Sequence, residues 1–427
     1  MALLENLNRA YFDERLSPGA LEHLAQLEEH PAEVSAFTER LFNRMKRAGL
    51  PASDFSKLLG WWVGVMMPRL LPGTWGGIIP PITVSGRHEV IDRYIRENTW
   101  TELPDRGTFL DIGCGFPPTT AADTALLFED WQVVGADPSI PDHIVYDALG
   151  DYASFDEHGE LLYFQSATAD FDRWDQLLHD PDATKKRFRE LRNRLVSNDS
   201  DSEGSARLER DPVRQHARGN LSLRQGGIGE IDISNVDVAR CFNVFLYYDL
   251  AFRKQALEWF ASILNPGGLF LCGTNQARSM ECRYTVYRNE KQGLSAKEFA
   301  FSLDNVRSQT IIPFYAFHDD EHDTEMLVRM IRAIRSNSEF MRGLDAHVDR
   351  LLSENELFRR EENGYLTYVA EDMPSKEQEQ RLLDISNQLD HDGYVEGAAQ
   401  ALTAAGLEAW RNPVGHIGVA PESIDHS

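Results

Sequence analysis

Apolar residues in the first part of the chain recur every three or four positions, which is the spacing of one buried helix face. This pattern runs from Ser17-Pro18, a signal for the start of a helix, to Gly49, a signal for the end of one. A second apolar stretch, rich in tryptophan and methionine, extends to Trp75. Residues 1–85 are therefore predicted to form an N-terminal helical cap, whose large rings either pack a core or line a ligand pocket.

Short runs of apolar residues come next, and such runs are typical of strands that are buried on both faces. Two of them, Thr108–Ile112 and Trp131–Asp137, are separated by a segment with helical character from Thr119 to Phe128. An alternation of strand and helix predicts an α/β fold with a parallel sheet. We place the two halves of this core at residues 86–172 and 231–275.

A pair of aromatic-rich segments follows, and a polar turn that contains Gly159 separates them. Residues 152–165 are therefore predicted to form a β-hairpin. The second arm of this hairpin is interpreted as the third strand of the sheet as well.

The remaining segments exceed what a bare α/β core needs. Residues 173–230 combine a run of lysines and arginines with a Ser/Asp/Asn-rich stretch, and we predict a charged, flexible insertion there. Its cationic run is a solvated helix face, or else a lid or an arm that binds an acidic partner. Residues 276–392 are predicted to be a second, helical cap, and residues 393–427 to supply the last helix and a closing pair of strands.

Composition narrows the class of partner. The 427 residues carry a formal net charge of −25, so binding to nucleic acid or to an anionic membrane is disfavoured, whereas small molecules and basic partners are favoured. The four cysteines include no Cys-x-x-Cys pair, which indicates reduced thiols rather than zinc ligands. The N-terminus has no secretion signal and no apolar stretch is long enough to span a bilayer, so we expect a cytoplasmic enzyme without a metal.

The candidate chemistry lies at the turn Asp111-Ile-Gly113-Cys114-Gly115, where the first strand meets its helix. Glycines let a backbone approach a ligand closely, and the start of a helix offers free N–H donors. Pro118 stands where a dinucleotide fingerprint has its third glycine, and the Gly-Lys-Ser/Thr of a P-loop is absent. Neither phosphate-binding motif is therefore supported.

The ligand expected at this turn carries no phosphates. Asp137 ends the second strand, where a carboxylate can accept both hydroxyls of a ribose, and Asp111 precedes the glycines. Two carboxylates favour a ligand that has a ribose and a positive charge. S-adenosylmethionine fits this description.

The same residues resemble a known family. The motifs Asp-Ile-Gly113-Cys-Gly and Val-Gly-Ala-Asp137 resemble motifs I and II of the class I S-adenosylmethionine-dependent methyltransferases. Residues 238–275 resemble the fourth strand, fourth helix and fifth strand of that fold, and their sequence is close to that of the chemotaxis-receptor glutamate methyltransferases. The chain departs from the pattern at Pro117, where a third glycine is common, and at Phe242, where the chemotaxis enzymes have an arginine.

This resemblance implies a Rossmann-like, seven-stranded methyltransferase sheet with an N-terminal helical cap and helical insertions. It also implies that S-adenosyl-L-methionine is the cofactor. The residues expected to bind it are Asp111, Gly113, Cys114, Gly115, Asp137, Pro138, Asp170 and Asn243. Asp170 is included because it follows the expected third strand, where it would hold the adenine amino group; its alternative role is the N-cap of the next helix.

The residues after the fourth strand predict the acceptor side of the site. Tyr247 and Tyr248 come directly after that strand, so we expect one of them to orient the nucleophile and the other to pack against the following helix. His318 is a candidate base. With His322 it has the i, i+4 spacing that can bind a metal, but the acidic residues between them favour a helix N-terminus instead.

These patterns predict an enzyme that transfers a methyl group to a small-molecule acceptor and that can form a homo-oligomer. Two other functions stay open: a protein carboxyl methyltransferase similar to the chemotaxis enzymes, and a protein that binds S-adenosylmethionine without catalysing a reaction. Neither nucleic acid nor a membrane is expected as a partner.

Overall fold

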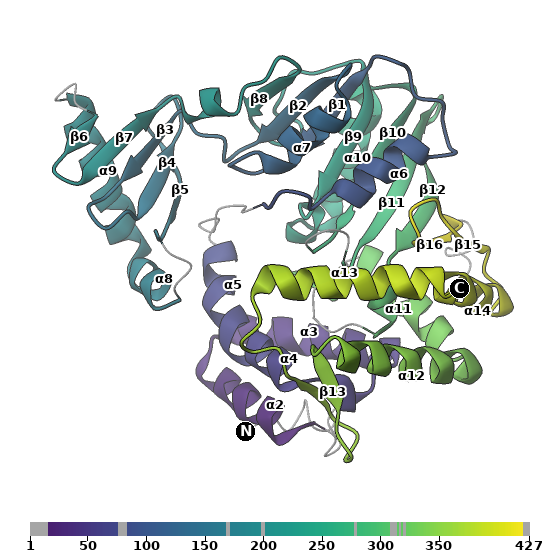
Figure 1. Cartoon of the computed structure of the whole chain (residues 1–427). Coiled ribbons are helices and arrows are strands. Elements are labelled where there is room, and N and C mark those ends of the chain that lie inside the picture. Colours follow the sequence, from purple (N-terminus) through teal and green to yellow (C-terminus); the bar gives the residue numbers. More distant parts are fainter. Residues whose placement is uncertain are drawn as a thin grey trace. The chain divides into compact units, whose positions relative to one another are not determined.

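The structure is a computed structural model of the chain, and it describes residues 16–75, 83–167, 171–197, 201–276, 280–307, 314–315, 317–318 and 322–421. They form two compact units, which are described separately (Figure 1). The first unit takes its residues from Met1–Pro68, Gly86–Leu103 and Cys241–Ser427. The second unit takes its residues from Arg69–Ser85 and Pro104–Arg240.

The N-terminal segment is helical, as predicted. Its helices are α2 (Pro18–Leu24), α3 (Ala32–Ala48), α4 (Lys57–Trp61) and α5 (Met67–Trp75), with 3-10 turns at Ala25–Glu29 and Ala52–Asp54 and a π-helical turn at Trp62–Met66. Ser17 caps α2, because its side chain accepts a hydrogen bond from the backbone N–H of Ala20. Gly49 ends α3 in the left-handed conformation, with a φ of 79°. Both helix signals are thereby confirmed.

An antiparallel set of strands lies in the first unit. In order across the sheet they are β10 (Leu264–Thr274), β11 (Arg283–Glu290), β12 (Gly293–Phe301), β16 (Ile417–Val419) and β15 (Ala409–Arg411). The closing pair β15 and β16 is confirmed, as is the helix before it, α14 (Tyr394–Ala404). Strands β11 and β12 correct the prediction, because the sequence pattern indicates a helical cap where they lie.

Helices make up most of the rest of this unit. They are α6 (Glu89–Glu97), α10 (Leu250–Ile263), α11 (His322–Arg335), α12 (Ser338–Glu354) and α13 (Ser375–His391), with 3-10 turns at Phe245–Tyr247 and Leu303–Arg307 and a hairpin of β13 (Phe358–Arg360) and β14 (Leu366–Tyr368). Helices α11, α12 and α13 lie within residues 276–392, where the sequence predicts helices, and their role as a cap stays a prediction.

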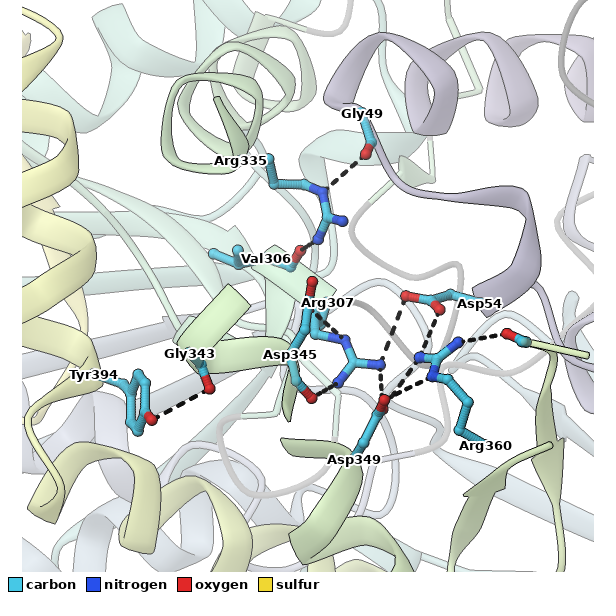
Figure 2. Close-up of polar contacts among 11 residues, drawn as sticks. Gly49, Asp54, Val306, Arg307, Arg335, Gly343, Asp345, Asp349, Arg360 and Tyr394 are labelled. Atoms are coloured by element: carbon cyan, nitrogen blue, oxygen red, sulfur yellow. Dashed lines mark hydrogen bonds and ion pairs between the residues drawn. The ribbon is translucent and has the colours of Figure 1, made fainter. Parts of the chain in front are cut away.

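Charged side chains tie these helices to the N-terminal segment (Figure 2). Asp349 of α12 lies 2.8 Å from Arg307 and 2.6 Å from Arg360. Arg360 also reaches Asp54, at 2.8 Å. Both arginines thus bridge carboxylates from separate parts of the chain, and Arg307 is almost completely buried. Because removal of one partner would leave a buried charge uncompensated, this network fixes the packing of the segments it joins.

The second unit contains the α/β core. Its strands β1 (Thr108–Ile112), β2 (Gln132–Asp137) and β8 (Leu221–Gln225) are parallel, and β9 (Val236–Phe242) stands next to β1 in the strand order. Helix α7 (Thr119–Leu127) connects β1 to β2. The predicted strand, helix and strand are therefore confirmed, whereas the complete seven-stranded sheet stays a prediction.

A second sheet lies between β2 and β8 along the chain. In order across the sheet its strands are β5 (Leu161–Gln165), β4 (Tyr152–Phe155), β3 (His143–Tyr146), β7 (Ala206–Arg210) and β6 (Ser202–Glu203). It is accompanied by α8 (Phe171–Leu178) and α9 (Pro181–Ser197), and a 3-10 turn at Pro212–Gln215 follows it. The β4–β5 hairpin is confirmed. Its second arm is not the third strand of the parallel sheet, because that place belongs to β8.

This inserted sheet has a hydrophobic core of its own, to which α9 contributes Phe188 and Leu195 and α8 contributes Trp174. The chain leaves the α/β core and returns to it at one point, because the backbone N–H of Asp211 donates to the carbonyl of Asp142 over 3.0 Å. Within the described part of the chain, no helix combines the length and the apolar character that crossing a membrane requires.

Candidate cofactor-binding site

The glycine turn after β1 is held against the end of β2. Gly113 and Gly115 have φ values of 78° and 69°, which glycine adopts without the strain that a Cβ would bring. The backbone N–H of Gly113 donates to the carbonyl of Ala136 over 2.8 Å. Helix α7 starts four residues beyond Gly115, and the backbone N–H of Thr119, its first residue, donates to the carbonyl of Pro117 over 2.8 Å.

Asp137 closes this turn from the other side. Its Oδ2 accepts the backbone N–H of Gly115 at 2.9 Å, and its Oδ1 accepts both the backbone N–H of Ser139 at 2.8 Å and the Ser139 hydroxyl at 2.5 Å. The side chain is almost completely buried, and burial raises the pKa of Asp137, although these hydrogen bonds oppose the shift. A desolvated carboxylate therefore stands directly behind the glycine backbone.

Asp111 lies deeper, and its charge is already compensated. Arg240 of β9 binds it with two contacts, Nε to Oδ1 at 3.0 Å and Nη2 to Oδ2 at 2.8 Å. The hydroxyl of Thr120 in α7 also donates to Asp111, over 2.9 Å. Because this pair is fully buried, the carboxylate of Asp111 holds β1, β9 and α7 together rather than offering a free charge to a ligand.

Cys114 turns its side chain into the fold instead of toward a ligand. A Cβ on Gly135 of β2 would meet Cys114 Sγ at 3.2 Å and Ala121 Cβ at 3.0 Å, so the thiol fills space between the turn, α7 and β2. Burial raises the pKa of Cys114 well above its usual value, which keeps the thiol protonated. The backbone N–H of Cys114 also points into the fold, where it donates to the carbonyl of Ala136 over 3.4 Å. Pro138, by contrast, is exposed just after Asp137.

Two further predicted cofactor residues lie outside the described part of the second unit. Asp170 lies outside the described residues, and its premise is wrong, because the strand before it is β5 of the inserted sheet. The strand that does take the third place, β8, continues into the loop Gly226–Glu230. Asn243 belongs to the first unit, where its side chain accepts the N–H of Asn275 over 3.1 Å and its amide donates to the Asn275 side chain over 3.2 Å.

The predicted pair of tyrosines is divided between two environments in the first unit. Tyr248 stacks on Phe252 of α10, with ring centroids 4.1 Å apart, which confirms that one tyrosine packs against the following helix. Tyr247 is 48% exposed and lies against Phe317, at 5.0 Å between centroids. Surrounding protein atoms nevertheless desolvate its phenolate and raise the pKa of Tyr247, while the charge of Arg87 lowers it. Tyr247 therefore remains the candidate for orienting a nucleophile.

His318 is brought next to Tyr247. Its Nε2 lies 3.3 Å from the backbone carbonyl of Tyr247. The histidine spacing with His322 does not build a metal site in the described residues, where no group of three or more His, Cys, Asp and Glu side chains could hold an ion. His322 begins α11 and Asp323 lies in its first turn, in agreement with a helix N-terminus after the acidic run.

Three residues of the site carry no signal in the sequence pattern. Arg240 stands within the buried strand β9, where a charged residue argues against a strand unless its partner is known. Ser139 and Thr120 act through hydroxyls that bind one carboxylate each. A buried arginine in an otherwise apolar run is the one feature that could have indicated a buried acidic partner, although nothing in the sequence singles out Asp111 as that partner.

Comparisons with known proteins give the following. No model of a protein family matches the chain, and no curated protein matches it either. Among solved structures, it is similar to PKMT2 from Rickettsia typhi in complex with AdoHcy, with 16% identity and a TM-score of 0.24 over 46% of this chain and 26% of that one.

Two more solved structures are similar at the same level. One is coclaurine N-methyltransferase bound to N-methylheliamine and SAH, with 10% identity and a TM-score of 0.24 over 64% of this chain and 56% of that one. The other is the 16S rRNA methyltransferase KamB, with 12% identity and a TM-score of 0.20 over 43% of this chain and 57% of that one. At these TM-scores the likeness carries no argument about function.

Proposed function

We propose that this chain binds S-adenosyl-L-methionine at the glycine turn of the second unit and transfers its methyl group to a small-molecule acceptor. The observation that carries the proposal is the hydrogen bond from Gly115 to Asp137, which joins a left-handed glycine turn to a buried carboxylate at the end of the next strand. A ligand with a ribose fits this pair, because a carboxylate is a strong acceptor for neighbouring hydroxyls.

The oxygens of Asp137 can accept only a few hydrogen bonds from such a ligand. A carboxylate has about four acceptor sites, and Gly115 and Ser139 already occupy three of them. One ribose hydroxyl can take the remaining site, and the second must replace the hydroxyl of Ser139. The backbone N–H of Ser139 would keep its bond, so the loop after β2 holds the carboxylate in place while the ribose binds.

The chain's own part in the reaction is to bind, to align and to exclude water. When bound, S-adenosylmethionine supplies a methyl group on a sulfonium sulfur, so that the acceptor's lone pair forms the new bond while the carbon–sulfur pair stays on sulfur. A hydroxyl or ammonium acceptor must also lose a proton, for which Tyr247 and His318 stay predictions. A carboxylate acceptor needs no base.

A small acceptor is favoured by the net charge of −25, which opposes nucleic acid and anionic membranes. Protein carboxyl methylation is not favoured by any feature of the site. A protein that binds the donor without transferring methyl is the remaining alternative, and it predicts donor binding with no turnover over any acceptor panel.

Calorimetric titration with S-adenosylmethionine and S-adenosylhomocysteine tests the proposal. The wild-type protein should bind both in the micromolar range, and Asp137→Asn should weaken both at least about 30-fold, because charge-assisted hydrogen bonds contribute about 1.5–3 kcal/mol each. Asp130→Asn, an exposed acid in the loop before β2, is the matched control and should bind like wild type. No binding by the wild-type protein, or equal binding by Asp137→Asn, would overturn the proposal.

A further inference from the structure

The inserted sheet of the second unit has two faces of different character. Helices α8 and α9 pack on one face, where the core of this sheet lies. Tyrosines from three neighbouring strands, Tyr146 of β3, Tyr152 of β4 and Tyr163 of β5, lie on the other face, because each stands next to a core residue in its strand (Figure 1). The ring centroids of Tyr146 and Tyr152 are 5.6 Å apart, and those of Tyr152 and Tyr163 are 6.4 Å apart. A row of aromatic rings therefore crosses this face.

Arg207 of β7 lies over the ring of Tyr146, at one end of this row. The two residues are direct partners in the register of β3 and β7, and the guanidinium carbon Cζ of Arg207 is 3.4 Å from the centroid of the ring. A planar guanidinium can make such close contact with the face of an aromatic ring. The side chain of Arg207 is nevertheless 54% exposed. The ring of Tyr146 therefore accepts a planar cation at the surface of the sheet.

Glu209 places a carboxylate at the edge of the same ring. It follows Arg207 by two residues in β7 and so lies on the same face. The hydroxyl of Tyr146 donates to Glu209 Oε2 over 3.1 Å, and the side-chain amide of Gln215 donates to Glu209 Oε1. The face of an aromatic ring and a partly buried carboxylate both attract positive charge, so together they favour a cation.

Arg207 is held in this place only weakly. Its Nη1 is 3.5 Å from Glu209 Oε2, which is longer than the usual distance of a charge-assisted hydrogen bond. An exposed ion pair of this kind adds little to stability. The side chain of Arg207 can therefore leave the ring of Tyr146 at small cost, which would open the ring face to a ligand.

We propose that the ring face of Tyr146 is a binding site for a small compound with a guanidinium group, and that Arg207 occupies this site in the free protein. A guanidinium is the expected occupant because the cation already in contact with the ring has that chemistry. The net charge of −25 draws cations toward the protein, and Glu209 accepts guanidinium N–H groups. Tyr152 offers a second ring for the apolar part of the compound. The site lies within one unit, goes beyond the proposed methyl transfer and does not depend on it.

Calorimetric titration of the full chain with phenylguanidine and with phenylurea, its neutral counterpart of similar shape, tests this site without any cofactor. Phenylguanidine should bind at least about 3-fold more tightly, because the ring and the carboxylate favour its charge. Glu209→Gln should reduce that preference. Tyr146→Leu should weaken binding of phenylguanidine at least about 3-fold, whereas Tyr146→Phe keeps the ring and should retain most of the affinity.

Replacement of Arg207 distinguishes a binding site from a structural contact. Arg207→Ala should strengthen binding of phenylguanidine about 3- to 10-fold, because it removes the side chain that competes for the ring. Arg210→Ala is the matched control: it removes the same charge from the opposite face of β7, where Arg210 pairs with Asp201 at 2.9 Å, and it should bind like wild type. Equal strengthening in both variants, unchanged affinity in Arg207→Ala, or equal affinity of the wild type for the two probes would overturn the inference.

Discussion

Arg240 and Asp111 form a two-contact ion pair in which the side chains are 0% and 3% exposed. Asp111 stands two residues before Gly113 in the chain, and the hydroxyl of Thr120 adds a third contact to its carboxylate. Its position explains how a charged residue is tolerated within the buried strand β9. It also means that the turn is supported by charges that a ligand never meets.

Arg240→Met should destabilise the protein by about 3–5 kcal/mol, because it leaves the carboxylate of Asp111 buried without a partner. Urea unfolding followed by circular dichroism measures the free energy. The double variant Arg240→Met/Asp111→Asn should recover most of the loss, since no buried charge then remains. A loss below about 1 kcal/mol in the single variant would show that water reaches Asp111.

Ser139→Ala should strengthen binding of S-adenosylhomocysteine by about 2- to 10-fold. The variant removes the hydroxyl that competes with a ribose for Asp137, and a net hydrogen bond is worth about 0.5–1.5 kcal/mol. Calorimetry against the wild type measures the change. Weaker binding would mean that the hydroxyl of Ser139 holds Asp137 in place and does not compete with the ribose.

Gly135→Ala should destabilise the second unit by about 1–3 kcal/mol, which is the usual effect of overpacking. The added Cβ would lie 2.8 Å from Leu223 Cδ2 and 3.0 Å from Ala121 Cβ, so the Leu223 side chain would have to shift and Ala121 would have to give way slightly. Gly219→Ala is the matched control, because nothing lies within 4 Å of a Cβ at that position. If both variants unfold at the same urea concentration, the packing around Gly135 is looser than the structure indicates.

The burial of His416 leads us to expect that the folded protein loses stability in acid. It is almost completely buried in the turn before β16, and burial lowers its pKa from 6.5 to about 4, with Arg93 adding to the shift and Asp390 opposing it. As the pH falls below 6.5, His416 binds a proton in the unfolded chain. In the folded chain it stays neutral until the pH reaches about 4. The stability present above pH 6.5 is therefore lost across this window, by up to about 3 kcal/mol.

Unfolding of the wild type and of His416→Gln at pH 7.5, 5.5 and 4.5 measures this effect. Both proteins should lose stability in acid as carboxyl groups titrate, but the loss should be smaller in the variant. Parallel curves would mean that His416 is accessible to protons in the folded state. The hydroxyl of Tyr284, 3.3 Å from His416 Nδ1, remains in both proteins and does not confuse the comparison.

The sequence predicts best where a local signal decides the structure. A helix cap or a positive φ depends on the residues next to it in the chain. Ser17 therefore caps a helix, and Gly49, Gly113 and Gly115 adopt positive φ, as their residue types indicate. Asp137 is likewise placed correctly behind the turn.

Prediction from the sequence fails mainly where residues that are far apart in the chain determine the structure. Strand β8 has a weak alternating pattern and is separated from β2 by the whole inserted sheet, so its place beside β2 depends on register and not on local propensity. Arg240 is missed for the same reason, since its partner Asp111 lies 129 residues earlier in the chain. Strands β11 and β12 are missed for a different reason: they follow each other in the chain and pair directly, but they carry many polar residues, which obscure the apolar pattern of a buried strand.

The inserted sheet has its own core, and its two ends meet at the hydrogen bond between Asp211 and Asp142. A segment with adjacent ends can be removed from a chain, or exchanged for another, without rerouting the strands on either side. This position between β2 and β8 is therefore the natural place to shorten the protein by design, because a pruned version would keep the glycine turn and Asp137 while it loses the inserted strands.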